Sequence, residues 1–431
     1  MKKVLIITYY WPPSGGAGVQ RWLKFVKYLR EFGWEPVIYT PLNPGFSLID
    51  ESLVIDIPEG VEVVKRAIWE PYGFYRKITG QKNEANINTG FLTHKEPNGF
   101  FEKLSIWVRG NLFIPDARRF WIGPSTRYLI KYLKKNRVDA IVSTGPPHSM
   151  HMIGLKIRKK TALPWIADFR DPWTDFDFYK DMKISGWADR THKRLELQTI
   201  TECSAVVVVS NDMKVNYEKM GGRNVNLITN GYDADDIDST VVLRDVKFSI
   251  SHIGSLPPNR NPKLLWRALS ELCDTIPTFR EDLEIKLVGQ VDESVLSDLK
   301  MLNLNQQLNH ISYVPHNQVS ELMKKSSVLL LAINNSSNAK GILTGKFFEY
   351  LASGRPILAI GPKSGDAAQI LQDSGAGEIV DYDENMRIVE VIRALYEKYL
   401  QNDLINNPKG IEKYSRKNLT ADLAAILNKI T

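Results

Sequence analysis

Short apolar runs recur along the chain and alternate with longer stretches in which apolar residues return every three or four positions. The short runs predict buried strands, and the longer stretches predict amphipathic helices. Strands and helices in repeated alternation are typical of an α/β fold with parallel, doubly wound sheets. The predicted strands are residues 4–8, 35–39, 61–65, 140–144, 165–167, 205–210, 225–228, 248–253, 284–288, 311–313, 328–332, 357–360 and 379–381. The clearest predicted helices are residues 18–31, 346–353, 385–400 and 409–430.

The first predicted helix has one continuous apolar face, and Gly33 follows it as an end signal. The apolar face consists of Val19, Trp22, Leu23, Val26 and Leu29. The same periodicity predicts that the basic residues Arg21, Lys24 and Lys27 face solvent.

Length and charge narrow the class of protein. A chain of 431 residues exceeds what one hydrophobic core normally serves, so we expect two domains. Residues 1–200 hold 31 Lys and Arg against 20 Asp and Glu, which favours an anionic ligand or a membrane surface. Nucleic acid is not expected as a partner, because no recognition motif accompanies the charge.

A cytoplasmic location is expected. The N-terminus runs straight into a strand, and the chain has no uncharged apolar window of about 18 residues. Cys203 and Cys273 are too few for a disulfide framework and are interpreted as buried thiols.

The alternation of strands and helices fails between residues 68 and 120, which are dense in aromatic and basic side chains. This composition is typical of segments in the headgroup layer of a bilayer, and residues 100–109 are the stretch expected to lie there. An insertion packed on its own domain is equally compatible with the composition. The residues concerned are Trp69, Tyr72, Phe74, Tyr75, Phe91, Phe100, Phe101, Trp107, Phe113 and Phe120, with Arg76, Lys77, Lys103, Arg109, Arg118 and Arg119.

The stretch from Gly341 to Pro362 has the order expected at a ligand-binding edge: a loop with glycines, a short helix and a buried strand. Glycines leave the backbone free to direct N–H groups at an anion, and a helix N-terminus adds partial positive charge. Lys346 is unfavourable at a helix start unless an anion is bound. Glu349 emerges from an apolar wall, where it is placed to accept two sugar hydroxyls. A plain amphipathic helix with one exposed glutamate is the alternative.

The run Gly-Lys-Phe-Phe-Glu-Tyr-Leu-Ala-Ser-Gly-Arg-Pro at residues 345–356 resembles the donor-site segment of family 4 glycosyltransferases of the GT-B fold. The resemblance covers nearly the whole chain. It implies that Glu349 holds the nucleotide ribose and that the preceding loop holds the diphosphate. The family usually has a second glutamate eight residues earlier, where Gly341 stands in this chain.

The fold that the resemblance implies is two doubly wound, Rossmann-like domains facing each other across a cleft, with a C-terminal helix crossing back to the first domain. We expect an acceptor-binding domain over residues 1–233 and a linker over residues 234–246. A nucleotide-sugar-binding domain is expected over residues 247–408, followed by the closing helix over residues 409–431.

The same resemblance implies a donor site built from several loops. In the family, the glycine loop after the first strand, which contains Gly15 and Gly16 in this chain, lies over a phosphate of the donor. A bare turn is the alternative interpretation of this loop. The sequence pattern of a dinucleotide-binding loop is absent there. The family commonly has an arginine directly after the glycine at position 254. Ser255 stands there in this chain, so Arg260 and Lys263 are expected to supply the cations. The expected donor-binding residues are Gly15, Gly16, Gly254, Arg260, Lys263, Val314, Thr344, Gly345, Lys346 and Glu349.

Two further polar segments follow predicted strands, at residues 144–151 and 167–173. Ligands bind at the carboxyl ends of strands in open sheets. Both segments also resemble the acceptor half of a subgroup of the family, the second through its Asp-Phe-Arg-Asp-Pro-Trp run. The expected acceptor-binding residues are His148, Asp168, Arg170 and Asp171. A structural Arg170–Asp171 pair is the alternative.

Neither a cofactor nor a metal is expected. Asp175 and Asp177 match the Asp-x-Asp pattern of a metal-binding pair in sequence alone, with no third ligand evident. His148 and His151 also lack a further ligand. Fixed cations and helix dipoles would then stabilise the departing diphosphate. The expected catalytic residues are Arg260, Lys346, Asp171 and His148.

The expected activity is transfer of a hexosyl or N-acetylhexosaminyl group from a UDP- or GDP-linked donor to a glycan or lipid-linked acceptor. Retention of anomeric configuration and a role in cell-surface polysaccharide or glycolipid synthesis follow from the resemblance. Peripheral contact at the inner face of the membrane is expected from the aromatic and basic insertion. Two alternatives stay open: a GT-B sugar-nucleotide epimerase, and a catalytically silent binding subunit, which Gly341 and Ser255 keep in view.

Overall fold

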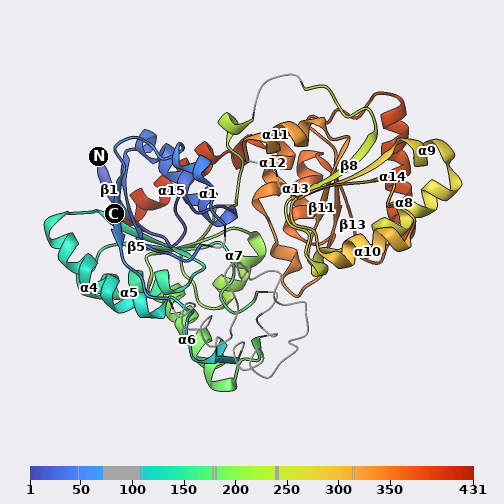
Figure 1. Ribbon diagram of the computed structural model, residues 1–431. Coiled ribbons are helices and arrows are strands. Elements are labelled where there is room, and N and C mark those ends of the chain that lie inside the picture. Colours follow the sequence, from blue (N-terminus) through green and yellow to red (C-terminus); the bar gives the residue numbers. More distant parts are fainter. Residues whose placement is uncertain are drawn as a thin grey trace. The chain divides into compact units, whose positions relative to one another are not determined.

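The computed structural model describes residues 1–46, 48–70, 107, 108, 110–176, 179, 182–237, 242–312, 314 and 316–431. The chain forms two compact units (Figure 1). Unit 1 comprises Met1–Thr229 together with Arg416–Thr431, and unit 2 comprises Asn230–Ser415. Several residues singled out in the sequence lie outside the described ranges. They are the insertion residues 71–106 and 109, Asp177, and Tyr313 and Pro315 in the loop around Val314.

Unit 1 contains a parallel sheet with the strand order β3-β2-β1-β4-β5-β6-β7 and helices on both faces (Figure 1). Its strands are β1 (Lys2–Ile7), β2 (Trp34–Pro41), β3 (Glu62–Arg66), β4 (Ala140–Gly145), β5 (Trp165–Phe169), β6 (Ala205–Val208) and β7 (Val225–Leu227). Its helices include α1 (Ala17–Leu29), α4 (Arg119–Lys135), α5 (Ser149–Thr161), α6 (Gly186–Glu202), α7 (Asn211–Lys219) and α15 (Arg416–Ile430).

Unit 2 repeats this architecture with the strand order β10-β9-β8-β11-β12-β13. Its strands are β8 (Phe248–Ile253), β9 (Leu283–Val288), β10 (Leu308–Ile311), β11 (Val328–Ala332), β12 (Ile357–Ile360) and β13 (Gly377–Val380). Its helices include α8 (Lys263–Thr275), α9 (Pro277–Asp282), α10 (Glu293–Met301), α11 (His316–Lys325), α12 (Gly345–Ala352), α13 (Asp366–Ser374) and α14 (Asn385–Leu400).

The prediction of parallel, doubly wound sheets is confirmed, since neighbouring strands pair in parallel in both units. Several predicted boundaries differ from the structure, and two of them differ clearly. The strand expected at residues 311–313 is β10, which already ends at Ile311. The closing helix begins at Arg416 instead of residue 409, after a short turn at Glu412–Tyr414.

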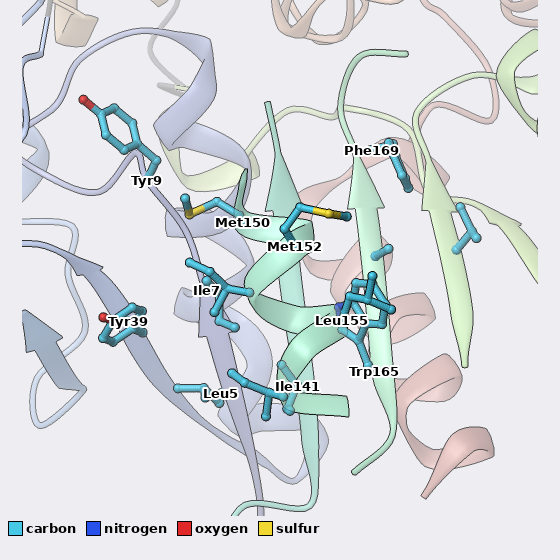
Figure 2. Close-up of a cluster of buried hydrophobic side chains, with 14 of the residues drawn as sticks. Leu5, Ile7, Tyr9, Tyr39, Ile141, Met150, Met152, Leu155, Trp165 and Phe169 are labelled. Atoms are coloured by element: carbon cyan, nitrogen blue, oxygen red, sulfur yellow. The ribbon is translucent and has the colours of Figure 1, made fainter. Parts of the chain in front are cut away.

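The sheets are buried on both faces because alternate strand residues point to opposite sides. In β1, Leu5 and Ile7 pack in the cluster that contains α5, whereas Val4 and Ile6 pack in the cluster that contains α1. Figure 2 shows the first cluster, in which Ile7 lies near Met150 of α5. Burial on both faces explains why these strands are continuous apolar runs.

The prediction that Arg21 and Lys24 face solvent is wrong, because both side chains are buried. The guanidinium of Arg21 forms an ion pair of 2.9 Å with Asp168, and Lys24 lies 3.2 Å from Asp56. Helix α1 is enclosed by the sheet and also by α15, whose Leu423 joins the same apolar cluster. The local periodicity of the helix carries no information about a covering helix from the far end of the chain.

The described flanks of the insertion are aromatic and partly exposed. Trp69 and Phe120 make an edge-to-face contact with ring centroids 4.9 Å apart, and they are 59% and 46% exposed. Glu70 and Arg118 form an ion pair of 2.9 Å. In the part of the chain that the structure describes, none of the helices combines the length and apolarity that a membrane span requires.

Candidate active site

Both sheets reverse their strand order once, and in parallel sheets this reversal opens a crevice at the carboxyl ends of the strands, where ligands bind. In unit 2 the reversal lies between β8 and β11. A pocket of about 160 Å³ opens there, lined by residues 259–264, which form the end of the loop after β8 and the start of α8, and by Ile333 and Asn335 after β11. Gly254, directly after β8, has φ of +117°, a conformation that favours glycine and turns the chain into this loop.

Helix α12 presents its N-terminus without a side-chain cap. Thr344 occupies the cap position but makes no capping hydrogen bond. Its buried Oγ1 has no hydrogen-bond partner among the residues that the structure describes. A Cβ built on Gly345 would meet no atom within 4 Å. An open helix N-terminus beside an unpaired hydroxyl is suited to an anionic ligand.

Lys346, in the first turn of α12, is directed toward the end of β8. Its Nζ lies 3.3 Å from Nε2 of His252. Burial and, to a smaller extent, the positive charge of Arg260 lower the pKa of Lys346 to about 7, whereas Glu349 opposes the shift. His252 was missed in the sequence, although a histidine two residues before Gly254, at a strand end, was a usable signal.

Arg260 and Lys263 follow β8 but have different surroundings. Arg260 ends the short turn Pro258–Arg260, and its Nε donates to Oδ1 of Asn334, which follows β11. The Lys263 side chain is 64% exposed, and its Nζ lies 3.6 Å from Asp298. Both residues line the pocket, but Arg260 is held by Asn334, whereas Lys263 is directed at the partly buried Asp298.

Two other expected donor-binding residues, Glu349 and Val314, lie in unit 2. Glu349 is partly buried, one turn after Lys346 on α12, and Val314 is partly buried. Their contacts with a ribose and a base stay predictions.

In unit 1 the strand order reverses between β1 and β4. The glycine loop follows β1, where the N–H of Gly15 donates to the carbonyl of Leu48 at 2.9 Å. Gly16, with φ of +89°, is the cap residue of α1. The assignment of both glycines to a donor phosphate also stays a prediction.

The side chains of His148 and His151 lie close together, just after the carboxyl end of β4. His148 is stacked on Trp173 with ring centroids 4.5 Å apart, and His151 Nδ1 lies 2.9 Å from the hydroxyl of Ser143. Both rings are buried, and burial lowers the pKa of each, that of His151 to about 3, so both are neutral at pH 7. His148 Nδ1 and His151 Nε2 have no hydrogen-bond partner among the described residues. Two unpaired ring nitrogens at a strand end are consistent with a bound hydroxyl or water.

Asp168, an expected acceptor-binding residue, has several partners within unit 1. Its carboxylate is buried and already occupied, since it accepts hydrogen bonds from Arg21, from Trp22 Nε1 at 2.8 Å and from Thr144 Oγ1 at 2.9 Å. Burial alone would raise the pKa of Asp168, but the guanidinium of Arg21 and the two other donors bring it below its usual value. Asp168 therefore holds the ends of β4 and β5 against α1, and its contact with an acceptor stays a prediction.

Arg170 and Asp171 follow on the same loop. Arg170 donates to the carbonyl of Pro146 at 2.6 Å, and its guanidinium lies 5.5 Å from the ring centroid of Tyr10. Asp171 is exposed. Both stay candidates for acceptor contacts. Among the described residues, no group of three or more His, Cys, Asp or Glu side chains is arranged to hold a metal ion.

The two parallel sheets with their helices define an α/β protein with two Rossmann-like units. Residues 234–417 match the family model "Glycosyl transferases group 1", and residues 83–236 match the model "Glycosyltransferase Family 4". The chain thus belongs to the family 4 glycosyltransferases of the GT-B fold.

Solved structures show the same fold at low identity. A sucrose-phosphate synthase from Thermosynechococcus elongatus has a TM-score of 0.60 and 14% identity, with 100% of this chain and 97% of that chain covered. WaaG, a glycosyltransferase involved in lipopolysaccharide biosynthesis, has a TM-score of 0.55 and 13% identity, with 99% and 98% covered. The structure "Trehalose-6-phosphate from E. coli bound with UDP-2-fluoro glucose" has a TM-score of 0.59 and 9% identity, with 100% and 99% covered. No curated protein matches the chain significantly in sequence.

Proposed function

We propose that this glycosyltransferase moves a hexosyl or N-acetylhexosaminyl group from a UDP- or GDP-linked donor to a glycan or lipid-linked acceptor, with retention of anomeric configuration. The proposed setting is cell-surface polysaccharide or glycolipid synthesis. The observation that carries the donor site is the open N-terminus of α12, where the unpaired Thr344 hydroxyl lies close in sequence to Lys346. Arg260 at the same crevice adds a second cation.

The proposed reaction is an exchange at the anomeric carbon. The bond from that carbon to the diphosphate oxygen breaks, and its electron pair leaves with the diphosphate. Lys346, Arg260 and the α12 N-terminus stabilise the charge that develops there. An acceptor hydroxyl attacks from the same face and its proton passes to the leaving phosphate oxygen. His148, Arg170 and Asp171, at the ends of β4 and β5, are the proposed acceptor-binding residues.

Contact with a membrane surface is part of this proposal. It is supported by the exposed aromatic side chains of Trp69, Trp107 and Phe120 and by the neighbouring cation of Arg119. Co-sedimentation with anionic vesicles, which should weaken as salt is added, tests this part by itself.

The donor is identified by a thermal-shift panel of nucleoside diphosphates and their sugars. A ligand that binds only the native state raises the melting temperature according to its affinity. Slow hydrolysis of the stabilising sugar nucleotide by the protein alone would support a transferase. Isomerisation without an acceptor would indicate an epimerase, and binding without any turnover would indicate a silent subunit. Failure of every nucleotide to stabilise the chain would contradict a donor site.

Replacing Thr344 by valine tests the helix N-terminus. The hydroxyl has no partner among the described residues, so Thr344→Val should leave the melting temperature of the free protein unchanged. Loss of one hydrogen bond to a phosphate should weaken nucleotide binding about 2- to 10-fold. Titration calorimetry measures the effect, with Thr275→Val on an exposed position of α8 as the control. Wild-type affinity in Thr344→Val would remove the hydroxyl from the site.

A further inference from the structure

His252 is buried at the end of β8 and its tautomer is set by its neighbours. It is 1% exposed, and its Nδ1 lies 3.0 Å from the carbonyl oxygen of Leu330. Because a carbonyl only accepts, Nδ1 carries the proton. Burial, together with the charges of Lys346 and Arg260, lowers the pKa of His252 well below its usual value, so the ring is neutral. Its Nε2 therefore offers a lone pair.

That lone pair accepts a hydrogen bond from Lys346. The Nζ of Lys346 lies 3.3 Å from Nε2, and the amino group donates through its N–H whether or not it is charged. The carbonyl of Ser255 lies equally far from Nε2. It cannot be a hydrogen-bond partner of an unprotonated nitrogen, since both atoms are acceptors.

Three consecutive residues at the end of β8 determine where the side chain of Lys346 lies. His252 contacts Nζ, and the N–H of Ile253 donates to the hydroxyl of Tyr350 on α12 at 2.9 Å. A Cβ on Gly254 would lie 2.6 Å from Nζ, so the ammonium occupies space that only glycine leaves. Strand β8 and helix α12 are thus joined at the point where Lys346 emerges.

We infer that His252 is a positioning residue of the donor site, whose neutral ring holds the Lys346 ammonium at the N-terminus of α12 for a nucleoside diphosphate. This inference rests on the proposed function. His252 acts through Lys346 and does not contact the ligand.

The charged groups that face Lys346 predict how binding depends on pH. They are His252 on β8, Arg260 after β8 and Glu349 on α12. With a pKa of about 7, Lys346 is mostly neutral at pH 8 in the free protein. A bound diphosphate favours the ammonium, so the protein should take up roughly 0.9 proton per nucleotide at pH 8. An apolar residue in place of His252 removes the acceptor and should make protonation of Lys346 harder.

The test uses the full chain with His252→Leu, His252→Phe and His252→Gln, titrated with the nucleoside diphosphate that stabilises the wild type most. Calorimetry at pH 6 to 9, in two buffers of different ionisation enthalpy, gives affinity and proton uptake. The apolar variants should bind about tenfold more weakly at pH 8, with the loss of affinity beginning at lower pH. His252→Gln, whose amide oxygen accepts a hydrogen bond, should stay within about threefold of the wild type.

The control is His192→Leu. It replaces a buried histidine that lies in unit 1, outside the proposed donor site, and this variant should bind the nucleotide like the wild type. A purely structural role would lower the melting temperature of the His252 variants without moving the pH dependence. Wild-type affinity and proton uptake in either apolar variant would overturn the inference and leave the donor site intact. Absence of nucleotide binding by the wild type at every pH would instead overturn the proposed function, and the inference with it.

Discussion

Replacing Lys346 by methionine is expected to lower turnover by about a hundredfold or more. The reason is that Lys346 lies in the first turn of α12, where the leaving diphosphate is proposed to develop charge. Thr344, two positions earlier, has a hydroxyl without a hydrogen-bond partner among the described residues. Initial rates with the sugar nucleotide found in the thermal-shift panel measure the effect. Lys340→Met is the matched control, because Lys340 is an exposed lysine in the same segment.

Lys346→Met is expected to make the free protein more stable, although it lowers turnover. The folded-state pKa of Lys346 is lowered from 10.5 to about 7, so below pH 7 the folded protein carries an unfavourable ammonium. This penalty shrinks as pH rises from 7 toward 10.5. Lys346→Met should therefore raise the melting temperature of the free protein most at pH 6 and less at pH 9. A variant that is less stable and fully active would contradict both assignments.

Replacing Asp168 by asparagine is expected to lower the free energy of unfolding by about 3–5 kcal/mol. The neutral amide would leave the buried guanidinium of Arg21 without its counter-charge, which lies 2.9 Å away in the wild type. Urea unfolding at pH 7 measures the loss. Since the pKa of Asp168 is lowered in the folded state, its contribution is present above the ordinary carboxylate pKa and disappears as pH falls through the folded-state value.

An exposed ion pair gives the comparison. Glu378 pairs with Arg387 on the surface of unit 2, and Glu378→Gln should cost less than about 1 kcal/mol. The double variant Asp168→Asn with Arg21→Met should recover part of the loss, because it removes the uncompensated charge. Equal costs for the buried and exposed carboxylates would show that Asp168 does not hold the strand end.

Most features of the donor segment, residues 341–362, could be predicted from nearby residues alone. The loop, the helix start, the position of Lys346 and the strand at residues 357–360 follow from glycine, charge and apolar periodicity within about twenty residues. The helix was placed within one residue at each end. Boundaries were less secure where the apolar signal was weak, as at β10 and at the start of α15.

What the sequence by itself determined was the alternation of strands and helices and the doubly wound class, because strands buried on both faces must be continuous apolar runs. Tertiary structure alone decided which polar groups meet. Arg21 and Asp168 are 147 positions apart, and His252 and Lys346 are 94 apart. A buried charge requires a partner, but that partner is chosen by which strand ends and helix starts the sheet order brings together. For this reason Arg21 was predicted to face solvent and His252 was overlooked, although the helix and the strand that carry them were both predicted.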